Sequence, residues 1–302
     1  MGDLRCYQRR FNAMGSPCDL KIYADSKSRG QHMLQRMVDE IERLESRYSR
    51  YRSDSLLSKI NRVADLGGEI EVDEETAGLL TYLETCFKES HGLFDATSGI
   101  LREAWSFKDQ SLPSDQMIAS LLDRVGWKKL SWQAPLLRFQ KPRMALDFGG
   151  AVKEYAVDRL IGLCWHAEIV HGLINLGGDI GIIGPHPDGT PWTIGLTHPR
   201  RPGEFIATLR LMKGALASSG DYERCIEVDG IRYGHILNPK TGWPVRHLAA
   251  VSVLADLCVV AGSASTIAML KEAEGPGWLQ NLGVAHLWVD VDGTSGGSLV
   301  PG

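Results

Sequence analysis

The stretch LDFGGAVK, residues 146–153, places two glycines at the start of a predicted helix, with a carboxylate before them and a lysine in the first turn. Helix N-termini present unpaired N–H groups and a partial positive charge, so this helix start can hold a phosphate or a metal-bound oxygen, and Lys153 would add a full charge. A glycine-rich loop that packs closely on a sheet, with Lys153 in solvent, accounts for the same residues about equally well. The stretch also marks a boundary, because the patterns before it are mainly helical and those after it mainly extended.

Amphipathic helices precede this stretch. Apolar residues recur at three- and four-residue spacings from Met33 to Leu44, which predicts a long helix with one buried stripe. A second helix is predicted over 74–90, with Gly92 as a left-handed cap, and a shorter helix over 117–125. Ahead of them, the alternation of apolar and polar residues over 18–24 predicts a strand.

Short strands dominate the chain after the paired glycines. A third long helix follows these glycines, and the apolar runs beyond it are short and bounded by Gly, Pro and Asp. Strands are predicted at 172–176, 180–183, 192–197, 205–211, 231–237, 250–255 and 284–291, and a helix at 259–271. Since no internal repeat or low-complexity linker divides the chain, we expect one α+β unit of mixed sheets and flanking helices over residues 1–302.

Composition narrows the class of function. The chain has 302 residues, of which 43% are hydrophobic and 23% charged, as is usual for globular proteins. Its net charge is −4 and no stretch carries an excess of Lys and Arg, so nucleic acid is not an expected partner. The six cysteines form no C-x-x-C pair, as is usual in a reducing compartment. Residues 1–10 contain no apolar leader of the kind that directs export. Asp256 interrupts the most apolar segment, 248–270, which is therefore too short to span a membrane. We therefore expect a soluble, cytoplasmic protein without a membrane span.

Three further polar segments lie among the predicted strands. NLGGDI, residues 175–180, either brings backbone close to a ligand or forms a hairpin with Asp179 in its turn. SSGDY, residues 218–222, and GHILNPKTG, residues 234–242, are rich in turn formers, and His235 either shuttles protons near neutral pH or is hydrogen bonded locally. The sequence contains no G-x-G-x-x-G, P-loop, H-E-x-x-H or G-x-S-x-G motif, which argues against Rossmann, P-loop, zincin and α/β-hydrolase functions.

Taken in order, seven motifs resemble those of the ApbE family of FAD:protein FMN transferases, over about Phe11 to Leu270. They are AMGS at 13–16, SRYRSDS at 49–55 followed by Asn61, GLFD at 92–95, D-x-G-G-x-x-K at 147–153, N-x-G-G-D at 175–179, SGDY at 219–222, and H-x-x-N-P-x-T-G at 235–242. The resemblance implies a T-fold-related α+β structure that binds one FAD and cleaves its pyrophosphate with the help of Mg²⁺. FMN would pass to a threonine or serine hydroxyl of a partner protein, and AMP would be released.

The same resemblance assigns roles to individual residues. It implies flavin contacts from Met14 and Tyr51, a pocket lined by Leu93, Phe94 and Asp95, FAD held by Asp147, Lys153, Gly178, Asp179 and Ile236, and a metal bound by the Gly150 carbonyl and Thr266. His235 is the first candidate for deprotonating the acceptor hydroxyl, and Asp221 is the second. Oxygen ligands and substrate phosphates are what Mg²⁺ prefers, so this chemistry agrees with the assignment.

The chain departs from the family pattern at its late helix. Where the family usually has Ala-Asp-Ala-x-x-Thr, residues 261–266 read AGSAST, so Thr266 is kept and Gly262 stands in place of the metal-ligating aspartate. Loss of this carboxylate should weaken Mg²⁺ binding unless Asp256, Asp179 or the diphosphate compensates. Glu154 stands where the family has glycine, and adds negative charge near the expected phosphates. The alternative function is therefore an FAD-binding protein, or an FAD pyrophosphatase, with impaired transfer.

Overall fold

The computed structural model describes residues 3–107, 111–222 and 224–300. The helices are α1 (Lys27–Tyr48), α2 (Leu56–Leu66), α3 (Glu74–Glu89), α4 (Asp115–Leu122), α5 (Val152–His166), α6 (Cys258–Lys271) and α7 (Gly275–Leu282), with short 3-10 helices η1 (Ala96–Glu103), η2 (Trp127–Lys129) and η3 (Glu272–Glu274). The strands are β1 (Arg5–Ala13), β2 (Ser16–Ala24), β3 (Glu69–Glu71), β4 (Leu130–Gln133), β5 (Leu136–Phe139), β6 (Gly172–Leu176), β7 (Asp179–Gly184), β8 (Trp192–Thr197), β9 (Phe205–Leu211), β10 (Gly214–Gly220), β11 (Cys225–Val228), β12 (Ile231–Gly234), β13 (Leu248–Ala255), β14 (Ala285–Asp290) and β15 (Ser295–Gly296).

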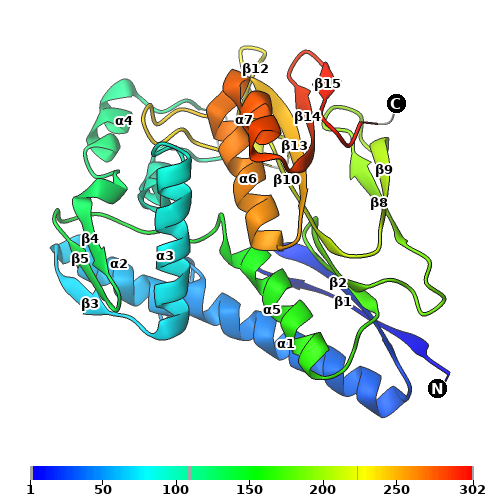
Figure 1. Cartoon of the computed structure of the whole chain (residues 1–302). Coiled ribbons are helices and arrows are strands. Elements are labelled where there is room, and N and C mark those ends of the chain that lie inside the picture. The colour runs from blue at the N-terminus through cyan, green and yellow to red at the C-terminus, as the bar shows by residue number, and fades with distance from the viewer. Residues whose placement is uncertain (1–2, 108–110, 223, 301–302) are drawn as a thin grey trace.

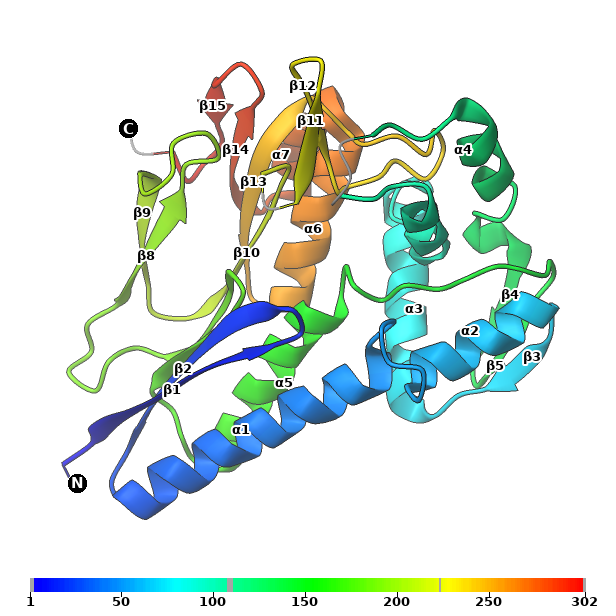
Figure 2. The same cartoon turned by 180° about the vertical axis from the view of Figure 1, so that it is seen from behind.

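An eight-stranded sheet of order β1-β2-β6-β7-β10-β13-β14-β15 organises the chain. Each neighbouring pair in it is antiparallel. Helices α5 and α6 lie against one face of this sheet and meet at their N-terminal parts, and α1 runs across its lower end (Figure 1). The view from behind shows the strands in front of the same helices (Figure 2). The structure confirms the predicted α+β class.

Side-chain periodicity explains how the sheet and helices join. Strand β2 buries Cys18, Leu20 and Ile22 on one face, as its alternating sequence predicts. Helix α1 buries a stripe from Met33 to Leu44 against them. On the opposite face of the sheet, the β8–β9 hairpin covers a second apolar cluster that includes Ile182. The central sheet is therefore packed on both faces.

A smaller group of elements lies away from both termini. Helices α2, α3 and α4 and the sheet of order β3-β5-β4 form this end of the molecule (Figure 1). Helix η1 packs in a third apolar cluster, which includes Leu101, Trp105, Ile226 and Leu237 and joins this end of the molecule to the β11–β12 pair. The polar motifs of the sequence lie where these two parts meet.

Most predicted elements are confirmed, but the sequence prediction lacks several observed ones, among them β1, α2, β10, α7 and the small β3-β5-β4 sheet. Strand β1 precedes the predicted first strand and is largely exposed on both faces, so its sequence shows no alternation. Strand β10, GALASSG, consists of small residues, and α2 is a short helix with only three buried positions. The predicted strand at 231–237 ends at Gly234, which leaves His235 and Ile236 outside the β-ladder. Within the described residues, no helix is both long and apolar enough to cross a membrane.

Candidate active site

One cavity collects most of the predicted site residues. Its walls come from η1, the first turns of α5, the start of β7, the end of β10, the segment after β12 and the second half of α6. The predicted residues in these walls are Leu93, Phe94, Asp95, Asp147, Gly150, Lys153, Asp179, His235, Ile236 and Thr266. Segments widely separated in the chain therefore converge on one site, as the motif order predicts.

The other predicted residues lie outside these walls. Met14 sits at the β1–β2 turn with a φ of +51°, a left-handed conformation that is unusual for this residue type. Gly178 lines a neighbouring groove together with Gly15 and Gly177. Tyr51 is 78% exposed, with the Arg50 guanidinium 5.3 Å from its ring centre.

The first turn of α5 shapes one wall of the cavity. No side chain caps this helix at Ala151. The Val152 amide donates to the carbonyl oxygen of Phe148 at 3.0 Å, so an anion would be held by the remaining first-turn amides and the positive end of the helix. Lys153 Nζ lies 2.8 Å from Asp179 Oδ2 and 3.5 Å from the carbonyl oxygen of Gly177. Because Gly177 also belongs to the neighbouring groove, Lys153 stands between the two hollows.

Asp147 is fixed by two arginines that the sequence prediction missed. Its Oδ2 lies 2.7 Å from Arg50 Nη1 and 3.6 Å from Arg102 Nε, and its Oδ1 accepts a hydrogen bond from the Gly149 amide at 2.9 Å. Burial alone would raise the pKa of Asp147, but the charges of Arg102 and Arg50 outweigh it and hold the pKa below its usual range. The carboxylate is therefore charged, and it orders the loop that leads into α5.

The Asp95 carboxylate holds the cavity wall together through hydrogen bonds. Its Oδ1 accepts hydrogen bonds from the amide and hydroxyl of Thr97, which cap η1, and its Oδ2 accepts one from the Trp127 amide. These contacts hold η1 in place, and with it Arg102.

His235 is a weaker base than a histidine in water. Burial and the nearby charges of Arg102 and Arg224 lower the pKa of His235 to about 4. Its Nδ1 is buried and has no hydrogen-bond partner among the described residues. The imidazole is therefore neutral near pH 7 and able to accept a proton, and a bound anion that offsets the two arginines would strengthen it as a base.

Asp221 is engaged by an arginine instead of facing the cavity. Both of its carboxylate oxygens accept hydrogen bonds from Arg200, each at 2.6 Å. The Asp221 side chain is 8% exposed and that of Arg200 is 26% exposed, so the pair is largely buried. This bidentate geometry suits a positioning role.

Removal of the Asp221 charge is expected to affect stability more than chemistry. The Asp221→Asn variant should lower the free energy of unfolding by about 2 kcal/mol, because Arg200 loses its charged partner in a partly buried setting. Urea unfolding measures this change, and Arg200→Gln combined with Asp221→Asn should recover part of it. Unchanged stability together with a large loss of activity would instead favour a catalytic role for Asp221.

The cavity offers oxygen ligands that suit a hard divalent cation. Thr266 Oγ1 lies 3.0 Å from Ser219 Oγ, and both residues line the cavity with Gly150 and Glu154. Glu154 is 8% exposed, and its Oε2 has no hydrogen-bond partner among the described residues. Over the described ranges, no group of three or more His, Cys, Asp or Glu side chains is arranged to hold a metal. This donor set fits Mg²⁺, which binds few protein carboxylates and completes its shell with phosphates and water.

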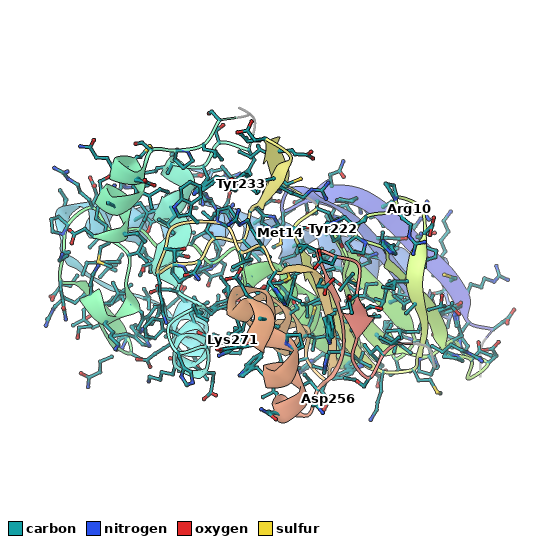
Figure 3. The ribbon with its side chains drawn as sticks, turned by 90° about the horizontal axis from the view of Figure 1, so that it is seen from above. Arg10, Met14, Tyr222, Tyr233, Asp256 and Lys271 are labelled. Atoms are coloured by element: carbon teal, nitrogen blue, oxygen red, sulfur yellow. The ribbon has the colours of Figure 1, made fainter. Side chains whose placement is uncertain are left out.

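The carboxylates expected to compensate for Gly262 differ in position. Asp179 lines the cavity, where it pairs with Lys153. Asp256 is exposed in the turn before α6, ten residues ahead of Thr266, which corresponds to roughly 15 Å along a helix. In Figure 3, Asp256 is labelled at the opposite edge of the molecule from Tyr233, and it is not among the residues that line the cavity. Asp256 therefore does not belong to the cavity.

Known proteins resemble this chain in sequence. The ApbE family model matches residues 14–288. A Chlamydia pneumoniae protein named FAD:protein FMN transferase is 32% identical over 252 residues, which cover 80% of this chain and 77% of that protein. A Rhodobacter capsulatus protein of the same name is 32% identical over 79% of this chain, which spans about half of that protein, 47%.

A solved structure extends the agreement to the fold. The ApbE protein from Thermotoga maritima superimposes with a TM-score of 0.89 at 30% identity, covering 97% of each chain. Because the family model covers most of the sequence and a solved relative matches nearly every element, the chain belongs to the ApbE family.

Proposed function

We propose that this protein transfers FMN from FAD to a threonine or serine hydroxyl of a partner protein, with release of AMP and with Mg²⁺ as the assisting ion. The observation that carries the proposal is the convergence of Asp147, Lys153, Asp179, His235 and Thr266 on one cavity. The names of the relatives support the same reaction.

The reaction balances with the groups available. The acceptor hydroxyl oxygen forms a bond to the phosphorus on the riboflavin side of FAD, the bridging P–O bond breaks, and AMP leaves with the bridging oxygen. Neutral His235 takes the hydroxyl proton. Mg²⁺, when bound, neutralises charge that develops on the phosphate oxygens.

The chain's own positive groups would orient the diphosphate. The uncapped N-terminus of α5 and the Lys153 ammonium face the same cavity and stabilise negative charge there. The neighbouring groove with Gly178, next to the turn that carries Met14, gives the extended cofactor a second hollow beyond Lys153. Exposed Tyr51 would then gain its flavin contact only when the cofactor is bound.

We place the reaction in the cytoplasm. All six cysteines are unpaired, as is usual in a reducing compartment. The acceptor would be a protein, or a domain of one, that presents its hydroxyl group in the cytoplasm.

Transfer is tested with the purified chain, FAD, Mg²⁺ and a panel of proteins that carry exposed Thr or Ser segments. We expect AMP by chromatography and a fluorescent flavin that stays with the acceptor on a denaturing gel. A chelator should abolish both signals and added Mg²⁺ should restore them. Failure of both signals across a broad panel would contradict the proposal.

The alternative function is supported by Gly262, which removes a carboxylate from the late helix. A pyrophosphatase would produce AMP and FMN without labelled acceptor, because water would replace the hydroxyl. A protein that only binds FAD would release no AMP. The same assay separates these outcomes.

A further inference from the structure

A buried carboxylate in the cavity has no partner that explains it. Glu154 lies in the first turn of α5 and is 8% exposed, and its Oε2 has no hydrogen-bond partner among the described residues. Buried polar groups are costly unless they are paired, and buried carboxylates are usually paired with cations or bound to metals. The roles given above to the other cavity residues do not use this oxygen.

Glu154 fills the space beside Gly262 on α6. A Cβ atom at position 262 would lie 2.5 Å from Cγ and 2.8 Å from Oε1 of Glu154. Any side chain there would collide with the glutamate, so the glycine and the glutamate depend on each other. Helices α5 and α6 meet at their N-terminal parts in both views, which allows the first turn of α5 to reach this face of α6 (Figures 1 and 2).

The face of α6 that Glu154 reaches also carries Thr266. Positions 262 and 266 are four residues apart and lie on the same side of a helix, one turn apart. The Thr266 hydroxyl is 3.0 Å from Ser219 Oγ, and Gly150 and Glu154 line the same cavity. The side chains and backbone here supply oxygen donors only, which favours Mg²⁺ or Mn²⁺ over softer ions.

We propose that Glu154 supplies, from α5, the carboxylate ligand of the divalent cation, in the space that a side chain at position 262 would otherwise occupy. The inference rests on the proposed function only in taking the cation to be Mg²⁺ and its other ligands to include the phosphates of FAD. Lys153 and Asp179, which form an ion pair at 2.8 Å, are the charged neighbours of Glu154. The two departures from the family pattern, Glu154 and Gly262, then form one compensated change, in which the carboxylate has moved from α6 to α5.

The test measures metal binding directly. Mn²⁺ is titrated into the full chain with FAD present, and free Mn²⁺ is followed by electron paramagnetic resonance. Glu154→Gln, which keeps the size of the side chain, should weaken Mn²⁺ binding at least ~10-fold. Glu89→Gln, at an exposed position on α3, is the matched control and should bind Mn²⁺ like the parent chain.

A second set of variants covers the case in which Glu154→Gln fails to fold. Glu154→Gly alone should lose Mn²⁺ affinity, and Glu154→Gly with Gly262→Asp should recover it, because the carboxylate returns from α6. Gly262→Asp alone should destabilise the protein, because its Cβ collides with Glu154.

The outcomes are separable from those of the transfer assay. Unchanged Mn²⁺ affinity in Glu154→Gln, or in Glu154→Gly, would overturn the inference, as would a parent chain that binds no Mn²⁺ with FAD. Loss of affinity on removal of Glu154 and its return in the double variant would support it, even if no acceptor protein were ever labelled. Absence of labelling in the parent chain would count against the proposed function alone.

Discussion

Replacement of Lys153 by methionine is expected to slow FMN transfer at least ~100-fold. The ammonium group lies on the cavity wall at the start of α5, 2.8 Å from Asp179 Oδ2. There it adds a full charge to a helix N-terminus, and in the proposed reaction both would stabilise the negative charge that grows on the leaving AMP. Methionine keeps the length and apolar stem of lysine, so the loss reports the charge. The measurement is the rate of AMP release at saturating FAD.

A structural effect of the same change must be separated from the chemical one. Asp179 is 3% exposed and loses its ion pair in this variant, which should lower the free energy of unfolding by roughly 3 kcal/mol. Lys153→Met combined with Asp179→Asn removes both charges and should regain most of this stability, as measured by urea unfolding. Transfer should stay slow in the double variant. If transfer returned together with stability, Lys153 would act only through folding.

Periodicity predicts the elements whose own residues show which face is buried. Helix α1 and strand β2 carry their buried stripe and their exposed face in the same short segment, so the pattern is complete. Strand β10 differs, because it pairs with β7 and β13 in the middle of the sheet and contacts α6. Its small residues leave room for that helix, and Ala215 and Ala217 are fully buried. The local sequence pattern does not show which distant helix will pack against a strand and bury its small residues.

The order of the motifs predicts the cavity better than any single motif does. Asp147 and His235 each have an ordinary explanation when read alone, yet they line the same cavity. The arginines that modify them were not predicted. Arg50 lies within a quoted motif without a role assigned to it, and Arg102 and Arg224 lie in segments with no motif. Their effects depend on pairings distant in sequence, which periodicity and spacing do not encode.

The sequence also presents Glu154 and Gly262 as two unrelated departures. One adds a charge and the other removes one, and both count against metal-assisted transfer when considered separately. The contact between them in space changes this conclusion, because the position 262 Cβ would lie within 2.5 Å of the Glu154 side chain. A substitution on one helix is therefore best judged together with the residue that packs against it.

The pH dependence of transfer is expected to distinguish His235 from an ordinary histidine. Because burial and the charges of Arg102 and Arg224 lower the pKa of His235 to about 4, the imidazole stays neutral throughout the range from pH 5 to 7. It loses the ability to accept a proton only as the pH falls through about 4. The acidic limb of kcat/KM, which reports the free enzyme, should therefore lie near pH 4, with little change between pH 5 and 7.

The bound state should behave differently from the free state. In the proposed complex, the diphosphate of FAD would bring negative charge close to Arg102 and Lys153, which line the cavity, and would offset the charges that disfavour protonated His235. The acidic limb of kcat, which reports the complex, should therefore lie at higher pH than that of kcat/KM. A single limb near pH 6.5 in both profiles would show that His235 is not held in this environment.

His235→Gln is expected to lower kcat by about 100-fold to 1000-fold, because glutamine keeps a polar side chain in the wall but cannot accept the acceptor's proton. FAD affinity, measured by flavin fluorescence, should change little, since in the proposed function the diphosphate is held by Lys153 and the start of α5, which line the cavity independently of His235. His32→Gln, at an exposed position on α1, serves as the matched control and should leave both quantities unchanged. A proportional loss of FAD affinity and kcat would assign His235 to FAD binding. Water would then have to take the proton of the acceptor hydroxyl.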